Sequence, residues 1–137
     1  MSVLVDTSVW SLALRRQRNE LPDGAVRELR DLIYERRARI IGPVRQELLS
    51  GLRDRSQFER LRAQLQPFPD LPVQTGDFER AAEIFNICRQ KGVQGSNTDF
   101  LLCAVAERYE IPILTLDGDF TNFAQHVPIR FYVPRRH

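Results

Sequence analysis

The feature that most restricts the fold of this 137-residue chain is an alternation of short apolar runs with longer helical patterns. Four runs have the length and composition of buried strands: Val3–Asp6, Arg39–Gly42, Ile113–Leu116 and Arg130–Val133. Apolar residues at helical spacing mark the intervening segments, which are Thr7–Arg16, Asp23 to about Arg36, a helix starting near Pro43, Phe58–Leu65, Phe78–Cys88 and Leu101–Tyr109. Because strands that alternate with helices form parallel sheets covered on both faces, the sequence predicts an α/β fold, a three-layer α/β/α sandwich with a mostly parallel central sheet.

Length and composition indicate an ordinary globular protein. Hydrophobic residues make up 42% of the chain and charged residues 28%, and the length favours a single domain over residues 1–137. No apolar run reaches the length of a membrane span, and the N-terminus lacks the pattern of a signal peptide, so we expect a cytoplasmic protein. Two cysteines, Cys88 and Cys103, fall in helical patterns without a nearby cysteine or histidine partner. They are predicted to be buried thiols.

The basic residues are almost all arginine, since only Lys91 among the 20 is a lysine. A guanidinium group suits phosphates and stacked bases. Codon bias explains the same count equally well, and the net charge of +2 is mild. A nucleic-acid partner is therefore permitted, but not required, by two clusters: Arg15, Arg16 and Arg18, and Arg36, Arg37 and Arg39.

Acidic residues occur where predicted strands end or the following helices begin, at Asp6, Glu47, Asp99, Asp117 and Asp119. In a parallel sheet these places converge on one edge, where ligands bind. Carboxylates gathered there repel one another unless a cation neutralises them. Oxygen ligands favour Mg²⁺ or Mn²⁺, and the two histidines, His126 and His137, lack the spacing of zinc ligands.

Each acid also has a purely structural interpretation. Asp6 can cap the helix that follows it, and Asp99 can complete a capping box that starts at Ser96. Glu47 can be a solvated helix residue. The Asp-Gly pair at Asp117 is a common turn dipeptide. Taken together, however, the five acids favour a metal site.

The stretch DGDFT, which starts at Asp117, matches the D-x-D-x-T signature of haloacid-dehalogenase-like phosphatases. In that family the motif follows the first strand, and a lysine comes later in the chain. Here the motif lies near the end of the sequence, and Lys91 precedes it. The position therefore argues against a phosphatase.

Four stretches in this order, VLVDTSVW, GPVRQELL, GSNTDFLLCAVA and ILTLDGDF, resemble the PIN-domain ribonucleases, especially the VapC-type toxins of bacterial toxin–antitoxin pairs. The resemblance spans nearly the whole chain, although residues 53–95 carry no family motif. It maps Thr7 or Ser8 onto a hydroxyl position beside the first acid. It maps the family's acidic quartet, and an additional aspartate of many members, onto Asp6, Glu47, Asp99 and Asp117, and onto Asp119.

The resemblance implies a metal-dependent endoribonuclease that cleaves RNA phosphodiester bonds. Asp6 and Asp99 would hold Mg²⁺ or Mn²⁺ with help from Asp117 or Asp119, of which Asp117 is favoured because it follows the strand directly. Glu47 would orient or deprotonate the attacking water. The family also implies a homodimer and a cognate antitoxin. A non-catalytic PIN-like module that binds RNA or protein, and a nuclease acting on DNA, stay open as alternatives.

Overall fold

The computed structural model describes residues 1–15 and 24–135, which form short strands and longer helices. The elements are, in chain order, β1 (Val3–Val5), α1 (Thr7–Arg15), α2 (Gly24–Tyr34), β2 (Ala38–Arg39), α3 (Gly42–Leu49), α4 (Arg55–Leu65), α5 (Thr75–Gln90), α6 (Asn97–Tyr109), β3 (Ile113–Leu114) and α7 (Asp119–Ala124). Helices α1 to α6 match the predicted helical segments. Helix α7 was not predicted, because six residues are too few to show a helical period.

The sheet is parallel and has the order β2-β1-β3. The central strand β1 pairs with both neighbours, so that Leu4 lies opposite Arg39 on one side and Ile113 on the other. All three residues of β1 are completely buried. The carboxyl ends of the strands therefore lie at one edge, and Asp6 is the first residue beyond the end of β1.

Two predicted strands end earlier than expected. The run Arg39–Gly42 contributes only Arg39 to β2, because Gly42 already begins α3, and Ile40 forms a single bridge to Asp70. The run Ile113–Leu116 leaves the sheet after Leu114. There the backbone N–H of Leu116 donates to the hydroxyl of Ser8 instead of to a strand.

The predicted strand Arg130–Val133 is reduced to one parallel bridge between Phe131 and Ile113. Ile113 donates its N–H to the carbonyl of Arg130, and Tyr132 donates to the carbonyl of Ile113, each at 2.9 Å. The segment thus covers the edge of β3 without becoming a full strand.

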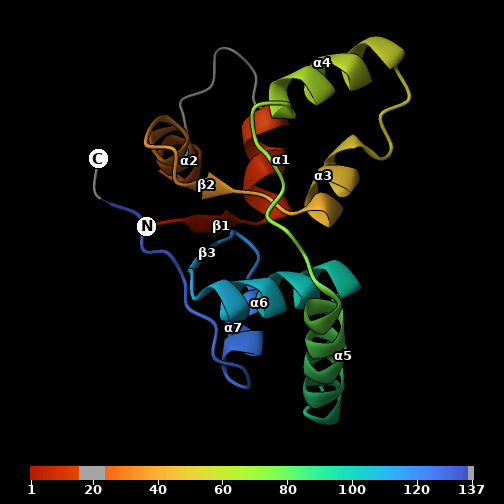
Figure 1. Ribbon diagram of the computed structural model, residues 1–137, viewed down its shortest axis with the longest axis vertical. Helices are drawn as coiled ribbons and strands as arrows, with labels where there is room; N and C mark the ends of the chain where they lie inside the picture. The colour runs from red at the N-terminus through yellow and green to blue at the C-terminus, as the bar shows by residue number, and fades with distance from the viewer. Residues whose placement is uncertain (16–23, 136–137) are drawn as a thin grey trace.

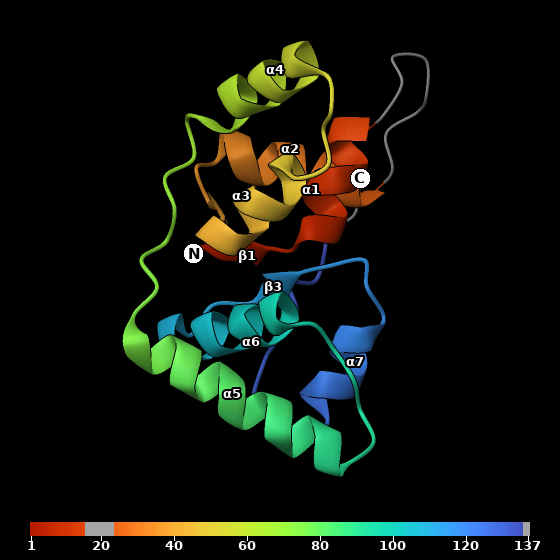
Figure 2. The same ribbon diagram turned by 90° about the vertical axis from the view of Figure 1, so that its right-hand side faces the viewer.

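Helices cover both faces of the sheet, which confirms the predicted three-layer α/β/α arrangement. Figures 1 and 2 show α1, α2, α3 and α4 on one side of the strands and α5, α6 and α7 on the other. On the second side three fully buried rings pack together, with centroids 5.0 Å apart for Phe100 and Phe123 and 5.2 Å apart for Phe120 and Phe123. These contacts fix the start of α6 against α7.

Both cysteines are free and buried, as predicted. Burial raises the pKa of the Cys88 thiol, and burial together with the charge of Asp99 raises that of Cys103. Among the described helices, none is both long enough and apolar enough to cross a membrane.

Candidate active site

Asp6 is 4% exposed at the junction of β1 and α1. Its Oδ2 accepts hydrogen bonds from the hydroxyls of Ser8 and Thr115, both at 2.8 Å, and from the backbone N–H of Ser8 at 3.4 Å. Asp6 therefore does cap α1, as its structural interpretation proposed. The two hydroxyls also hold the carboxylate in one orientation at the edge of the sheet.

Glu47 is exposed on α3 and lies beside the first turn of α1. The hydroxyl of Thr7 donates to Glu47 Oε2 at 3.1 Å. Thr7 and Ser8 therefore have different tasks, because Thr7 reaches Glu47 whereas Ser8 reaches Asp6. Through Thr7, the residue after Asp6, the structure connects two acids that are 41 positions apart in the sequence.

Asp99 is half-buried in the first turn of α6. The capping box is present: Ser96 N–H donates to Asp99 Oδ2 at 3.0 Å, and Asp99 N–H donates to the Ser96 hydroxyl at 3.1 Å. Burial raises the pKa of Asp99, and the negative charges of Asp6 and Asp117 raise it further. The structure thus brings Asp6, Asp99 and Asp117 close enough for their charges to interact.

Asp117 and Asp119 differ in their surroundings. Asp117 is half-buried, and its Oδ1 accepts the N–H of Asp119 at 2.9 Å, which forms the turn that the Asp-Gly pair indicated. Asp119 begins α7 and is exposed. Asp117 is the one whose charge acts on Asp99.

The acids are not assembled into a metal centre. Within residues 1–15 and 24–135, no group of three or more His, Cys, Asp or Glu side chains has an arrangement that could hold a metal ion. Yet Asp6, Asp99 and Asp117 each use one carboxylate oxygen for protein donors, and in the described part of the chain no hydrogen bond reaches the other oxygen. The free oxygens of the three carboxylates are the type of ligand that a hard divalent cation prefers.

Sequence reasoning missed Thr115, which holds the site together. Its hydroxyl donates to Asp6 and accepts the backbone N–H of Asp117 at 2.9 Å, so it links two of the acids. The residue is the polar member of the run ILTL, just beyond the end of β3. A hydroxyl at the end of a predicted parallel strand was the signal that could have identified it.

The arginine cluster of Arg36, Arg37 and Arg39 lies away from this site. Arg37 donates to the carbonyl of Met1 at 2.6 Å and to Glu35, and Arg39 donates to the carbonyl of Arg36, all near the start of β2. That end of a parallel sheet is opposite to Asp6. In the other cluster Arg15 ends α1, whereas Arg16 and Arg18 lie outside the described residues.

A family model described as PIN domain matches residues 3–125, which include all five candidate acids. The chain belongs to the PIN domain family. The predicted family is therefore confirmed, and the alternative of a haloacid-dehalogenase-like phosphatase is rejected. PIN domains are in general nucleases, and an acidic site at the carboxyl edge of the sheet agrees with that activity.

Other PIN-fold structures are similar along nearly their whole length. The match to FitAcB from Neisseria gonorrhoeae has 24% sequence identity and a TM-score of 0.74, and it covers 96% of this chain and 97% of that one. VapBC2 from Rickettsia felis, bound to a DNA fragment from its promoter, matches with 17% identity and a TM-score of 0.72 over 96% and 98% of the two chains. A toxin–antitoxin complex from Klebsiella pneumoniae matches with 18% identity and a TM-score of 0.63, over 87% and 90%. At these identities the similarity establishes the fold, and no match was found among curated proteins.

Proposed function

We propose that this PIN-domain protein is a Mg²⁺- or Mn²⁺-dependent endoribonuclease and the toxin of a toxin–antitoxin pair, acting in the cytoplasm. The observation that supports it most is the placement of Asp6, Asp99 and Asp117 at the carboxyl edge of the sheet, where burial and, to a smaller extent, the charges of Asp6 and Asp117 raise the pKa of Asp99. A protein that only binds a partner gains little from a group of carboxylates that are wholly or partly buried beside one another. A nuclease uses it to hold a cation.

When bound, a divalent cation would supply charge stabilisation at the phosphate oxygens and lower the pKa of a bound water. Asp6, Asp99 and Asp117 would hold it through the oxygens that have no protein donor. Glu47, oriented by Thr7, would position the attacking water or accept its proton. Asp119 would assist Asp117 through water.

Ser8 and Thr115 would act as positioning residues. Both hydroxyls donate to Asp6 Oδ2, and these two hydrogen bonds restrict the rotation of the carboxylate and so fix the direction of its other oxygen. Such support of a ligand's orientation commonly changes metal affinity by about 10- to 100-fold in proteins.

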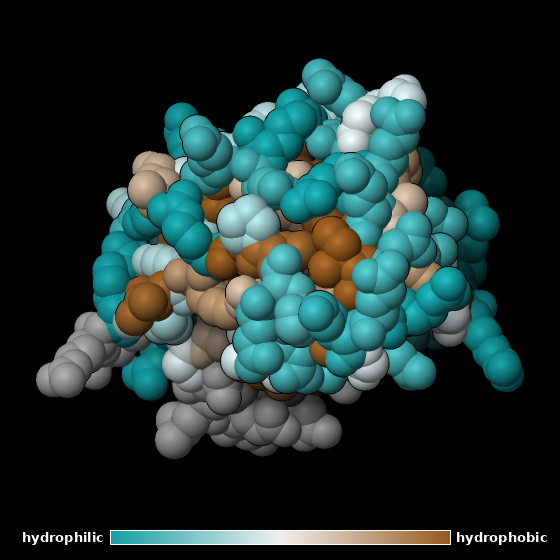
Figure 3. Space-filling model, turned by 90° about the horizontal axis from the view of Figure 1, so that it is seen from below, coloured by the Kyte–Doolittle hydropathy of each residue, from teal (hydrophilic) through white to brown (hydrophobic). Residues whose placement is uncertain are grey.

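A cognate antitoxin and a second copy of the chain are the proposed partners. The Klebsiella pneumoniae structure with the same fold is, by its own description, a toxin–antitoxin complex. Seen from the side of α5 and α7, the surface has an apolar area surrounded by polar side chains (Figure 3). Phe78 on α5 is 56% exposed beside Ala82 and Phe85, and an exposed apolar groove of this kind favours association.

The test is cleavage of labelled single-stranded RNA by the purified protein in Mg²⁺ or Mn²⁺, with and without EDTA. We expect cleavage that EDTA abolishes and that Asp6→Asn and Glu47→Gln reduce by at least 100-fold. Glu79→Gln, an exposed acid on α5, is the control and should cleave like the wild type. Equal rates for Asp6→Asn and the wild type would refute the site, and cleavage of DNA alone would refute the substrate class.

The absence of an assembled metal group in the described residues favours one competitor, a non-catalytic module that binds RNA. That function predicts RNA binding at any divalent concentration, no cleavage, and no effect of Asp6→Asn on affinity. Filter binding run beside the cleavage assay separates the two.

A further inference from the structure

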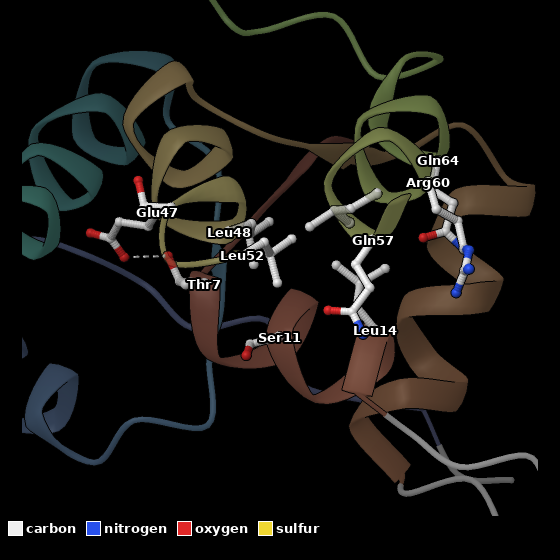
Figure 4. A pocket seen from close by; sticks show the side chains of 11 residues that line it. Thr7, Ser11, Leu14, Glu47, Leu48, Leu52, Gln57, Arg60 and Gln64 are labelled. Atoms are coloured by element: carbon white, nitrogen blue, oxygen red, sulfur yellow. Dashed lines mark hydrogen bonds between the residues drawn. The ribbon is translucent and has the colours of Figure 1, made fainter. Parts of the chain in front are cut away.

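A groove of about 480 Å³ opens beside the candidate active site, between α1, α3 and α4. Figure 4 shows the hydrogen bond between Thr7 and Glu47 at one end and Arg60 at the other. Thr7 and Leu14 both line the groove from α1, and their separation of seven positions along the helix gives the groove a length of roughly 10 Å. The groove is therefore continuous with the proposed reaction centre.

One wall is a polar face of α4 made by Gln57, Arg60 and Gln64. Spacings of three and four residues put these side chains on the same side of the helix. Each glutamine amide offers a hydrogen-bond acceptor and two donors. Leucines from all three helices, including Leu48 and Leu61, supply apolar surface between the polar groups.

Arg60 differs from its neighbours on α4. Arg55 and Arg62 both pair with Glu59, at 3.1 and 3.6 Å, on another face of the helix. Within the described residues, Arg60 has no ion-pair partner and is exposed at the end of the groove. An unpaired guanidinium at this place suits a phosphate group.

We propose that this groove binds the nucleotide next to the cleaved phosphodiester and selects its base. Gln57 and Gln64 would hydrogen-bond to the base edge, the leucines would contact the base face, and Arg60 would contact the neighbouring phosphate. Single-stranded RNA is recognised through such exposed base edges and faces. The proposal rests on the proposed ribonuclease function, because it assigns the substrate's base to the groove beside Glu47.

The test compares Gln57→Ala/Gln64→Ala, Arg60→Ala and the control Arg55→Ala on a pool of single-stranded RNAs with random sequence. The double variant should lower kcat/KM on the preferred sequences by about tenfold and leave poor sequences unchanged. Arg60→Ala should weaken all sequences alike and reduce the salt dependence of binding by about one charge. Arg55→Ala should match the wild type, because Arg55 is 86% exposed on the other face.

Affinity for labelled RNA, measured in the Asp6→Asn background, tests the groove independently of cleavage. If the groove variants bind and cleave RNA with unchanged sequence preference, the proposal is wrong. It is equally wrong if they lose only affinity for the co-purified antitoxin, because the groove is then a protein-docking site. RNA binding that depends on Gln57 and Gln64 without any wild-type cleavage would uphold the groove and reject the ribonuclease function.

Discussion

Gly95 is the position where one methyl group should disturb the candidate site from outside it. The residue precedes Ser96 and Asp99 in the loop that enters α6. A Cβ atom at Gly95 would lie 2.6 Å from Phe123 Cζ and 2.9 Å from Phe100 Cζ. Both distances are shorter than non-bonded carbon atoms tolerate, so Gly95→Ala requires the rings or the loop to move.

The rings have little room to yield. Phe123 is completely buried, Phe100 is 1% exposed, and Phe120 packs on Phe123 from another side. Overpacking of this kind costs about 1–3 kcal/mol, and the lower chain entropy of unfolded alanine offsets about 0.4–1 kcal/mol of it. We expect a net loss of about 1–2 kcal/mol, which corresponds to a fall in Tm of roughly 3–10 °C for a chain of this size.

Thermal and urea denaturation measure this effect, with Gly76→Ala as the matched control. A Cβ at Gly76 meets no atom within 4 Å, and the residue lies in the first turn of α5, where alanine is neutral or stabilising by up to about 1 kcal/mol. If Gly95→Ala is as stable as Gly76→Ala, the close approach of the loop to the two rings does not exist as described.

Three further predictions concern charge and burial. The raised pKa of Asp99 means that the folded state holds its proton more tightly than the unfolded state, so its contribution to stability is present below pH 4 and is lost as the pH rises through the folded pKa. In EDTA at pH 7, Asp99→Asn should therefore have a higher Tm than the wild type, and a lower Tm would contradict the raised pKa of Asp99. Cys88 and Cys103 should react with a thiol reagent only on unfolding, and fast labelling of the native protein would count against their burial. Tyr132→Phe removes a hydrogen bond of 2.5 Å to the fully buried Glu28. It should lower the free energy of unfolding, measured by urea denaturation, by about 1.5–3 kcal/mol. An unchanged urea midpoint would show that this bond does not hold the C-terminal segment in place.

The layers of this fold could be predicted because they depend on local patterns. Apolar runs and helical spacing located β1, β3 and helices α1 to α6 without knowledge of their contacts. Strand ends could not be predicted in the same way. The run after Leu114 keeps an apolar residue at Leu116, and only the bonds of its backbone to side-chain hydroxyls show why it leaves the sheet.

The candidate site could be predicted only in part, for a similar reason. Asp6, Asp99 and Asp117 were identifiable because each follows or precedes a recognisable element. The hydroxyl of Thr115 at a strand end was visible in the sequence, but its bond to Asp6, 109 positions away, was not. Gly95 was not identifiable, because its importance lies in the close approach of the Phe100 and Phe123 rings. Which side chain donates a hydrogen bond to each acid likewise depends on the packing of the whole molecule. A single sequence does not indicate it directly.

The central claim is that Asp6, Asp99 and Asp117 hold a divalent cation. Isothermal titration calorimetry of the protein with Mn²⁺ tests this claim most directly. The account predicts saturable binding to the wild type and to Glu79→Gln, and at least tenfold weaker binding to Asp6→Asn and Asp99→Asn. Wild-type protein that binds no Mn²⁺, or an Asp99→Asn variant that binds it as tightly as the wild type, would contradict the account.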